Sequence, residues 1–185
     1  MLEIEPTALP EVRIVKPRRY ADERGFFSEV YNKQSFVDAG ITAEFVQDNH
    51  STSTKAGTVR GLHFQVPPFA QEKLVRVSRG RILDVVVDLR RSSPTFKRHV
   101  TVELSADNWL QLLIPVGFAH GFCTLVDETE VVYKVTDYYS AAHDMGIAWN
   151  DPALGIPWPV APHEATLSAK DRQLPPLSQS LGLFP

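Results

Sequence analysis

The chain of 185 residues contains one cysteine, Cys123, so no disulfide can form within it. Cys123 stands in the apolar run from Gly121 to Leu125, which predicts a buried and unreactive thiol. No cysteine and histidine cluster has the spacing of a zinc site. No apolar run approaches the ~18 residues that span a membrane, and the N-terminal segment lacks the basic and apolar regions of a signal peptide. We therefore expect a cytoplasmic protein with no membrane partner.

An excess of charge of one sign is also missing. The 19 basic and 22 acidic residues are mixed along the chain and give a net charge of −3, which argues against nucleic acid as a partner. A few clustered Arg and Lys side chains would still suffice for a small anionic ligand. The length and the 43% of hydrophobic residues predict one domain over residues 1–185. We divide it at about 1–50 (N-terminal strands and a short helix), 51–140 (jelly-roll core) and 141–185 (C-terminal wrap).

Short β-favouring runs separated by turn residues dominate the chain, and no internal repeat is visible. The runs are Val12–Val15, Phe26–Tyr31, Phe45–Gln47, Leu74–Val77, Ile82–Leu89, Val100–Leu104, Leu110–Ile114 and Val131–Val135. Their number and spacing predict an all-β sandwich or barrel of the jelly-roll type. Helices are expected only at 32–39, ended by Gly40, and at 163–169. The Pro-containing stretch 174–185 is expected to wrap the surface or to be loose.

Alternation is visible along two of these runs, and it places one polar side chain, that of Lys73, on a mostly apolar face. Lys73 shares a face with Val75 and Val77, and Asp84 shares one with Val86 and Asp88. If the face that carries Lys73 lines the barrel interior, its ammonium group needs a functional reason to be there.

Seven short motifs identify a family. They are Arg24–Glu29, Gln47–Asn49, Arg60–Gln65, Pro115–Phe122, Tyr133–Tyr139, Trp149–Pro152 and Leu167–Arg172. In this order and over nearly the whole chain, they resemble the dTDP-4-dehydrorhamnose 3,5-epimerase family. The resemblance implies a cupin-type jelly roll with short peripheral helices, a homodimer, a dTDP-4-keto-6-deoxyhexose as substrate and no cofactor. Two features depart from the family pattern: Asp144 stands where a Glu is expected, and the run after Arg172 is unusually rich in proline.

The chemistry that the resemblance implies needs an acid and a base on opposite faces of a sugar. A ketone at C4 acidifies the C–H bonds at C3 and C5, and epimerisation removes a proton from one face and returns one to the other through an enolate. By resemblance, His63 is the base and Asp171 orients it. Histidine suits this role because its ordinary pKa near ~6.5 leaves it largely neutral at pH 7. Tyr133 is the acid and Lys73 stabilises the oxyanion.

Further residues match family positions that bind substrate. These are Arg24, Phe27, Glu29, Gln47, Asn49, Arg60, His120, Asp144 and Lys170. Arg and Lys suit a diphosphate, whereas Gln and Asn suit a pyrimidine edge or sugar hydroxyls. Strict alternation would send Arg60 and His63 to opposite faces, so a bulge or bend is expected at Gly61 if both meet the substrate. Residues 24–29 are expected to reach the site of a neighbouring subunit.

Three alternatives stay open at this point. A monofunctional epimerase of another deoxysugar pathway would keep the same acid and base. A metal-dependent cupin is suggested by the spacing of Pro115, Gly117 and His120, which resembles the second cupin motif, but the His-x-His pair of the first motif is missing at His63-Phe64-Gln65. We therefore expect no metal. A non-catalytic module that binds a sugar nucleotide would need no acid and base.

Overall fold

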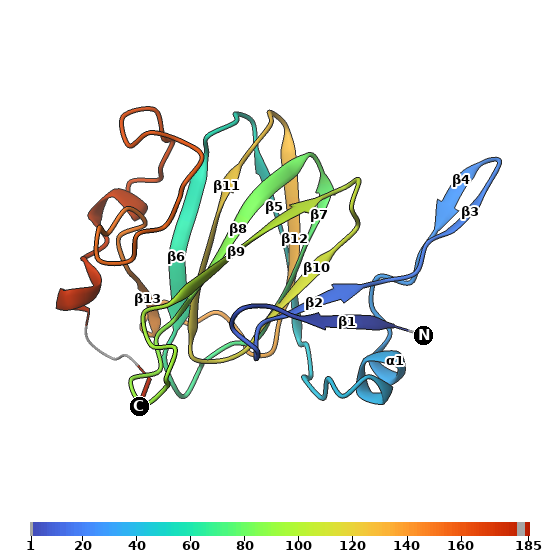
Figure 1. The fold of residues 1–185 in the computed structure, drawn as a ribbon, viewed down its shortest axis with the longest axis horizontal. Helices are drawn as coiled ribbons and strands as arrows, with labels where there is room; N and C mark the ends of the chain where they lie inside the picture. The colour runs from blue at the N-terminus through green and yellow to red at the C-terminus, as the bar shows by residue number, and fades with distance from the viewer. Residues whose placement is uncertain (1, 181–183) are drawn as a thin grey trace.

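The computed structural model describes residues 2–180 and 184–185, and two antiparallel sheets face each other in it (Figure 1). The larger sheet has the order β1 (Glu3–Pro6), β2 (Arg13–Lys16), β10 (Gln111–Ile114), β7 (Lys73–Arg79), β12 (Thr129–Val135) and β5 (Gln47–Ser53). The smaller has the order β13 (Asp144–Gly146), β6 (Val59–Gln65), β11 (Phe118–Thr124), β8 (Arg81–Asp88) and β9 (His99–Ser105). The predicted jelly-roll type of all-β fold is confirmed.

The remaining elements lie around these sheets. They are the hairpin of β3 (Tyr20–Asp22) and β4 (Gly25–Phe27), the helix α1 (Lys33–Asp38) and the 3-10 turns η1 (Asp171–Gln173) and η2 (Leu177–Gln179). In Figure 1 the hairpin extends away from the barrel on the same side as α1, and the C-terminal segment lies on the opposite side, beside β6.

The main core lies between the sheets and follows the alternation read from the sequence. Val75 and Val77 on β7 pack there with Val86 on β8, and all three are almost fully buried. Leu74 points the other way, into a separate cluster with Phe36 of α1. Each such fully buried aliphatic side chain contributes about 1.5–3 kcal/mol. The pattern fixes which face of each strand can line an internal cavity.

The helix expected at 32–39 is confirmed. Asn32 caps its N-terminus, where the side chain accepts a hydrogen bond from the Ser35 backbone N–H at 3.2 Å. Gly40 follows the helix with φ +80°, a backbone conformation that suits glycine. Cys123 is fully buried, and burial raises the pKa of its thiol to about 11, so the predicted burial of this cysteine is confirmed as well.

Three expectations about local structure are wrong. No helix forms at 163–169, because Thr166 instead forms a parallel bridge with Thr58 and its backbone bonds to Gly57 and Val59 at the barrel edge. The run 26–31 is a strand only as far as Phe27, where the hairpin ends. The run 45–47 precedes its strand, which begins at Gln47 and continues to Ser53.

The C-terminal wrap packs on the smaller sheet. Leu177 and Phe184 are buried there in a cluster with Leu62 of β6. Trp149 and Trp158 meet edge to face at 5.6 Å and cover Cys123. The described part of 174–185 therefore wraps the surface, while residues 181–183 of the predicted stretch lie outside the described residues.

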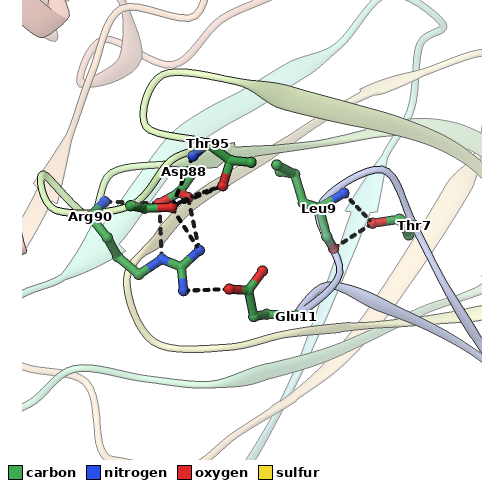
Figure 2. Close-up of polar contacts among 7 residues, drawn as sticks. Thr7, Leu9, Glu11, Asp88, Arg90 and Thr95 are labelled. Atoms are coloured by element: carbon green, nitrogen blue, oxygen red, sulfur yellow. Dashed lines mark hydrogen bonds and ion pairs between the residues drawn. The ribbon is translucent and has the colours of Figure 1, made fainter.

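A buried carboxylate at the end of β8 ties the N-terminal segment to the barrel (Figure 2). Asp88 accepts hydrogen bonds from Arg90 at 2.8 and 3.0 Å and from the hydroxyls of Ser93 and Thr95 at 2.6 Å. Arg90 also bonds Glu11 at 2.9 Å. Burial alone would raise the pKa of Asp88, but these donors outweigh it and lower the pKa to about 2. None of these residues lines the cavity described next.

Candidate active site

A cavity with two adjoining lobes opens between strands of the two sheets. The first lobe, of about 400 Å³, is lined by Gln47, Asn49, His63, Phe64, Gln65, Gln71, Lys73, Tyr133, Tyr139 and Asp144. The second, of about 250 Å³, is lined by Ser51, Arg60, His63, Lys73, His120, Phe122, Tyr133, Ser168, Lys170 and Asp171. Three of the four predicted catalytic residues, His63, Lys73 and Tyr133, line both lobes, and the fourth lines the second.

His63 is paired with Asp171, as predicted from residues far apart in the sequence. His63 Nε2 lies 2.6 Å from Asp171 Oδ1. This contact joins β6 to the start of η1. The Asp171 backbone N–H donates to Ser168 Oγ at 3.0 Å, which fixes the turn. Burial would raise the pKa of Asp171, but the hydrogen bond and charge of His63 outweigh it and lower this pKa. The carboxylate is therefore ionised and orients the imidazole.

Lys73 and Tyr133 lie on neighbouring strands of the other sheet. Val75, two residues along β7 from Lys73, is the register partner of Tyr133 on β12. The Lys73 ammonium lies 5.8 Å from the centre of the Tyr133 ring and donates to Gln71 Oε1 at 3.1 Å. Burial lowers the pKa of Lys73 to about 8, although the charge of Asp144 opposes this. Burial also raises the pKa of Tyr133 above its ordinary value, so the phenol keeps its proton at neutral pH.

The bulge expected at Gly61 is present. His63 pairs with His120 while Arg60 pairs with Phe122, so β6 has one more residue than β11 over this interval. Arg60 and His63 consequently both line the second lobe. Gly61 has φ +128°, and a Cβ there would lie 2.6 Å from Gly121 Cα. Glycine is therefore required where the two strands approach.

His120 belongs to a second pair of histidine and aspartate. Its Nε2 lies 2.9 Å from Oδ2 of Asp84, whose side chain is fully buried. Burial raises the pKa of Asp84, and the hydrogen bond and charge of His120 oppose that rise. The alternation along β8 placed Asp84 on one face with Val86 and Asp88 but gave it no role.

The first lobe is lined mainly by neutral polar groups. Gln47 donates to Asn49 Oδ1 at 2.9 Å. Asp144, the residue that departs from the family pattern, accepts a hydrogen bond from the Lys170 ammonium at 2.5 Å and so forms an ion pair with it. Tyr139, whose pKa is raised by its hydrogen bond to Asp144, was not predicted as a site residue.

Two further glutamines of the first lobe were also missed. Gln71 precedes Lys73 by two residues and so shares its side of the chain, a signal that could have found it. Gln65 bonds the backbone of Phe69, Tyr138 and Ser140, so it braces the wall of the lobe.

Three predicted substrate-binding residues do not reach the cavity of their own chain. Arg24 lies at the tip of the hairpin, pairs with Asp22 at 2.6 Å and has a side chain 85% exposed. Phe27, on β4, is 67% exposed. Glu29 follows the hairpin and accepts a hydrogen bond from Asn32 at 3.3 Å. In Figure 1 the hairpin stands well away from β6 and β12.

Neither a metal cluster nor a spanning helix was found in the part of the chain that the structure describes. No group of three or more His, Cys, Asp or Glu side chains there could hold a metal ion. No helix within residues 2–180 and 184–185 is long and apolar enough to cross a membrane.

Comparisons with known proteins identify the family of this chain. A family model described as dTDP-4-dehydrorhamnose 3,5-epimerase matches residues 6–179. The chain belongs to this family. The curated dTDP-4-dehydrorhamnose 3,5-epimerase of Shigella flexneri is 52% identical over 171 residues, which are 92% of this chain and 93% of that protein.

Two solved structures of the family share the fold. A dTDP-4-dehydrorhamnose 3,5-epimerase from Bacillus anthracis, with TDP and PPi bound, has a TM-score of 0.93 and 55% identity, over 96% of this chain and 100% of that one. A dTDP-6-deoxy-D-glucose-3,5-epimerase from Legionella pneumophila, in complex with dTDP-4-keto-L-rhamnose, has a TM-score of 0.92 and 43% identity, over 97% and 94%. The predicted cupin-type jelly roll is confirmed.

Proposed function

We propose that this protein is an isomerase that epimerises dTDP-4-keto-6-deoxyglucose at C3 and C5, giving dTDP-4-keto-rhamnose. Its family and the names of its relatives support the reaction. The observation that carries the proposal is the cavity in which the His63–Asp171 pair faces Tyr133 and Lys73. A binding module would need no such set.

His63 is the base in this proposal. It removes the proton from the carbon beside the ketone, and the electron pair of the C–H bond moves into the enolate. The ionised Asp171, 2.6 Å from Nε2, holds the ring so that its other nitrogen accepts the proton, and it stabilises the imidazolium that forms. The same base serves C3 and C5, because both carbons flank one ketone.

Tyr133 is the acid on the other face of the sugar. It stands on β12 of the larger sheet, whereas His63 stands on β6 of the smaller one, and both line both lobes. A sugar ring at the boundary between the lobes would therefore have one group on each face, as inversion requires. The phenol is protonated at neutral pH and returns a proton to the enolate carbon. Water then takes the proton from the imidazolium of His63 and returns one to the phenolate of Tyr133, which restores both groups for the next inversion.

Lys73 stabilises the enolate oxygen. Its ammonium group lies beside Tyr133 in a site largely shielded from water, where a fixed positive charge acts more strongly on a developing oxyanion than it would in solvent. Arg60 and Lys170 in the second lobe supply further positive charge for a diphosphate. The amides of Gln47 and Asn49 in the first lobe suit hydroxyls or the edge of a pyrimidine.

We further propose that the protein acts in the cytoplasm as a homodimer of single-domain subunits. The projecting hairpin supports the dimer, since its Arg24 and Phe27 are exposed and remote from their own cavity. In a dimer they would complete the partner's site. Mixing two inactive variants, Arg24→Ala and His63→Ala, tests this. Recovery of about a quarter of the wild-type rate is expected if one mixed dimer site keeps both side chains, and no recovery would contradict the shared site.

The experiment that tests the function measures turnover of the dTDP-4-keto sugar by His63→Ala and Tyr133→Phe. Both should lose turnover yet still bind dTDP. The matched control is His50→Ala, because His50 stands on β5, is paired with Glu130 at 3.3 Å and lines neither lobe. Full activity in His63→Ala would overturn the proposal. Inversion at one carbon only by the wild type would assign a monofunctional reaction instead.

A further inference from the structure

The pair of His120 and Asp84 has no part in the mechanism above, although it is built with the same geometry as the base and its aspartate. Asp84 is fully buried on β8, and its only hydrogen bond among the described residues is the one that its Oδ2 shares with His120 Nε2 at 2.9 Å. A buried carboxylate with one oxygen left without a partner is costly. The burial of Asp84 therefore points to a role beyond packing.

The two histidines stand side by side on the inner face of the smaller sheet. His63 and His120 are register partners on β6 and β11, and the Cβ atoms of such pairs are about 4.5–5.5 Å apart. Asp171 and Asp84 each bind the Nε2 atom of one ring. Both rings line the second lobe. The sugar next to the base therefore also meets His120.

We propose that Asp84 is a positioning residue for epimerisation at C3, because it holds His120 so that its Nδ1 accepts a hydrogen bond from the sugar hydroxyl at that carbon. This inference rests on the proposed function. With Nε2–H donated to the carboxylate, Nδ1 of the neutral ring is an acceptor. In a 4-keto-6-deoxyhexose the C3 flank of the ketone carries a hydroxyl that can donate. The C5 flank carries a methyl group and the ring oxygen, which cannot.

The two adjacent imidazoles therefore have different roles in the reaction. His63 takes the proton at either carbon, whereas His120 holds only the C3 side in line with it. Loss of Asp84 should therefore affect C3 more than C5. A purely structural role for Asp84 would lower the stability of the fold and the two rates together.

The test measures hydrogen–deuterium exchange at C3 and C5 of the dTDP-4-keto sugar by wild type and Asp84→Asn, which keeps the shape of the side chain and replaces its carboxyl group with an amide. We expect kcat for exchange at C3 to fall about 10- to 100-fold, as for loss of a buried hydrogen bond that positions the ring. Exchange at C5 should change less than about threefold, with a similarly small change in KM. The matched control is Asp88→Asn, since Asp88 is equally buried on the same face of β8 but bonds Arg90. The Asp88→Asn variant should be less stable than the wild type but keep the wild-type ratio of C3 to C5 exchange.

Equal loss at both carbons in Asp84→Asn, or no loss at either, would overturn the inference. A second measurement needs no variant. Nitrogen-15 NMR of the histidine rings in the wild type should show His120 with the proton on Nε2, and a proton on Nδ1 of the neutral ring would overturn it equally. If the wild type exchanges neither carbon, the proposed function fails instead, so the two failures are distinguishable.

Discussion

The charge state of Lys73 makes the reaction sensitive to alkaline pH. The lysine stabilises the enolate only as an ammonium ion, and its pKa is lowered to about 8 by burial. With that value about nine-tenths of the molecules carry the charge at pH 7, and about one-tenth carry it at pH 9. The rate should therefore fall roughly tenfold between these two pH values. Tyr133 does not cause this loss, because its pKa is raised above the ordinary tyrosine value and it remains protonated over most of the range.

The assay is the initial rate of deuterium exchange into the sugar from pH 6.5 to 9.5 at substrate concentrations well below KM, where the rate reports kcat/KM and therefore the pKa values of the free enzyme. Recovery of activity on return to pH 7 checks folding. Lys73→Arg should have a lower plateau but no alkaline fall, because a guanidinium stays charged throughout. Asp144→Asn should move the fall to lower pH, since the charge of Asp144 raises the pKa of Lys73. A wild-type rate that stays constant up to pH 9, or the same fall in Lys73→Arg, would refute the reasoning.

Three other outcomes follow from the contacts. Asp171→Asn should lower kcat about 10- to 100-fold with little change in KM, because the charge-assisted bond to His63 is lost; steady-state kinetics with a normal circular dichroism spectrum checks this, and an unchanged kcat contradicts it. Gly61→Ala should lower the free energy of unfolding by at least about 2 kcal/mol, since its Cβ would meet the backbone of β11; a wild-type urea midpoint would disprove this. Arg90→Ala should cost about 3 kcal/mol in the same assay by leaving Asp88 buried beside fewer donors, with kcat retained, whereas a loss of kcat in folded protein would link that cluster to the cavity.

Alternation and turn residues were sufficient to predict the fold class and which residues share a face of β7, but not which of its two faces points inward. That alternation put Lys73 on the same face as Val75, and the structure places Val75 in the core and Lys73 at the cavity. Strand β11 was harder to predict because Gly121 lies at its centre, and glycine has little β preference by itself. Its presence is explained by tertiary structure, since a side chain at Gly121 would collide with Arg60 and Gly61 of β6.

The site could be predicted only where a motif named the residue. Local sequence cannot show that Asp171 lies 2.6 Å from His63, because the contact depends on how the C-terminal wrap crosses β6. Asp84 was missed for a related reason. The role of a single aspartate in a buried strand cannot be predicted from the strand itself, because it depends on the pairing with β11 that places His120 beside it. The helix predicted at 163–169 does not form, because pairing with the barrel edge at Thr58 outweighs the local preference for helix.

The central claim is that one base inverts both carbons beside the ketone, and NMR of dTDP-4-keto-6-deoxyglucose with the protein in heavy water tests it most directly. The account predicts that deuterium enters at both C3 and C5 with wild-type protein, and at neither carbon with His63→Ala. Exchange that persists in folded His63→Ala, or no exchange at either carbon with the wild type, would contradict it.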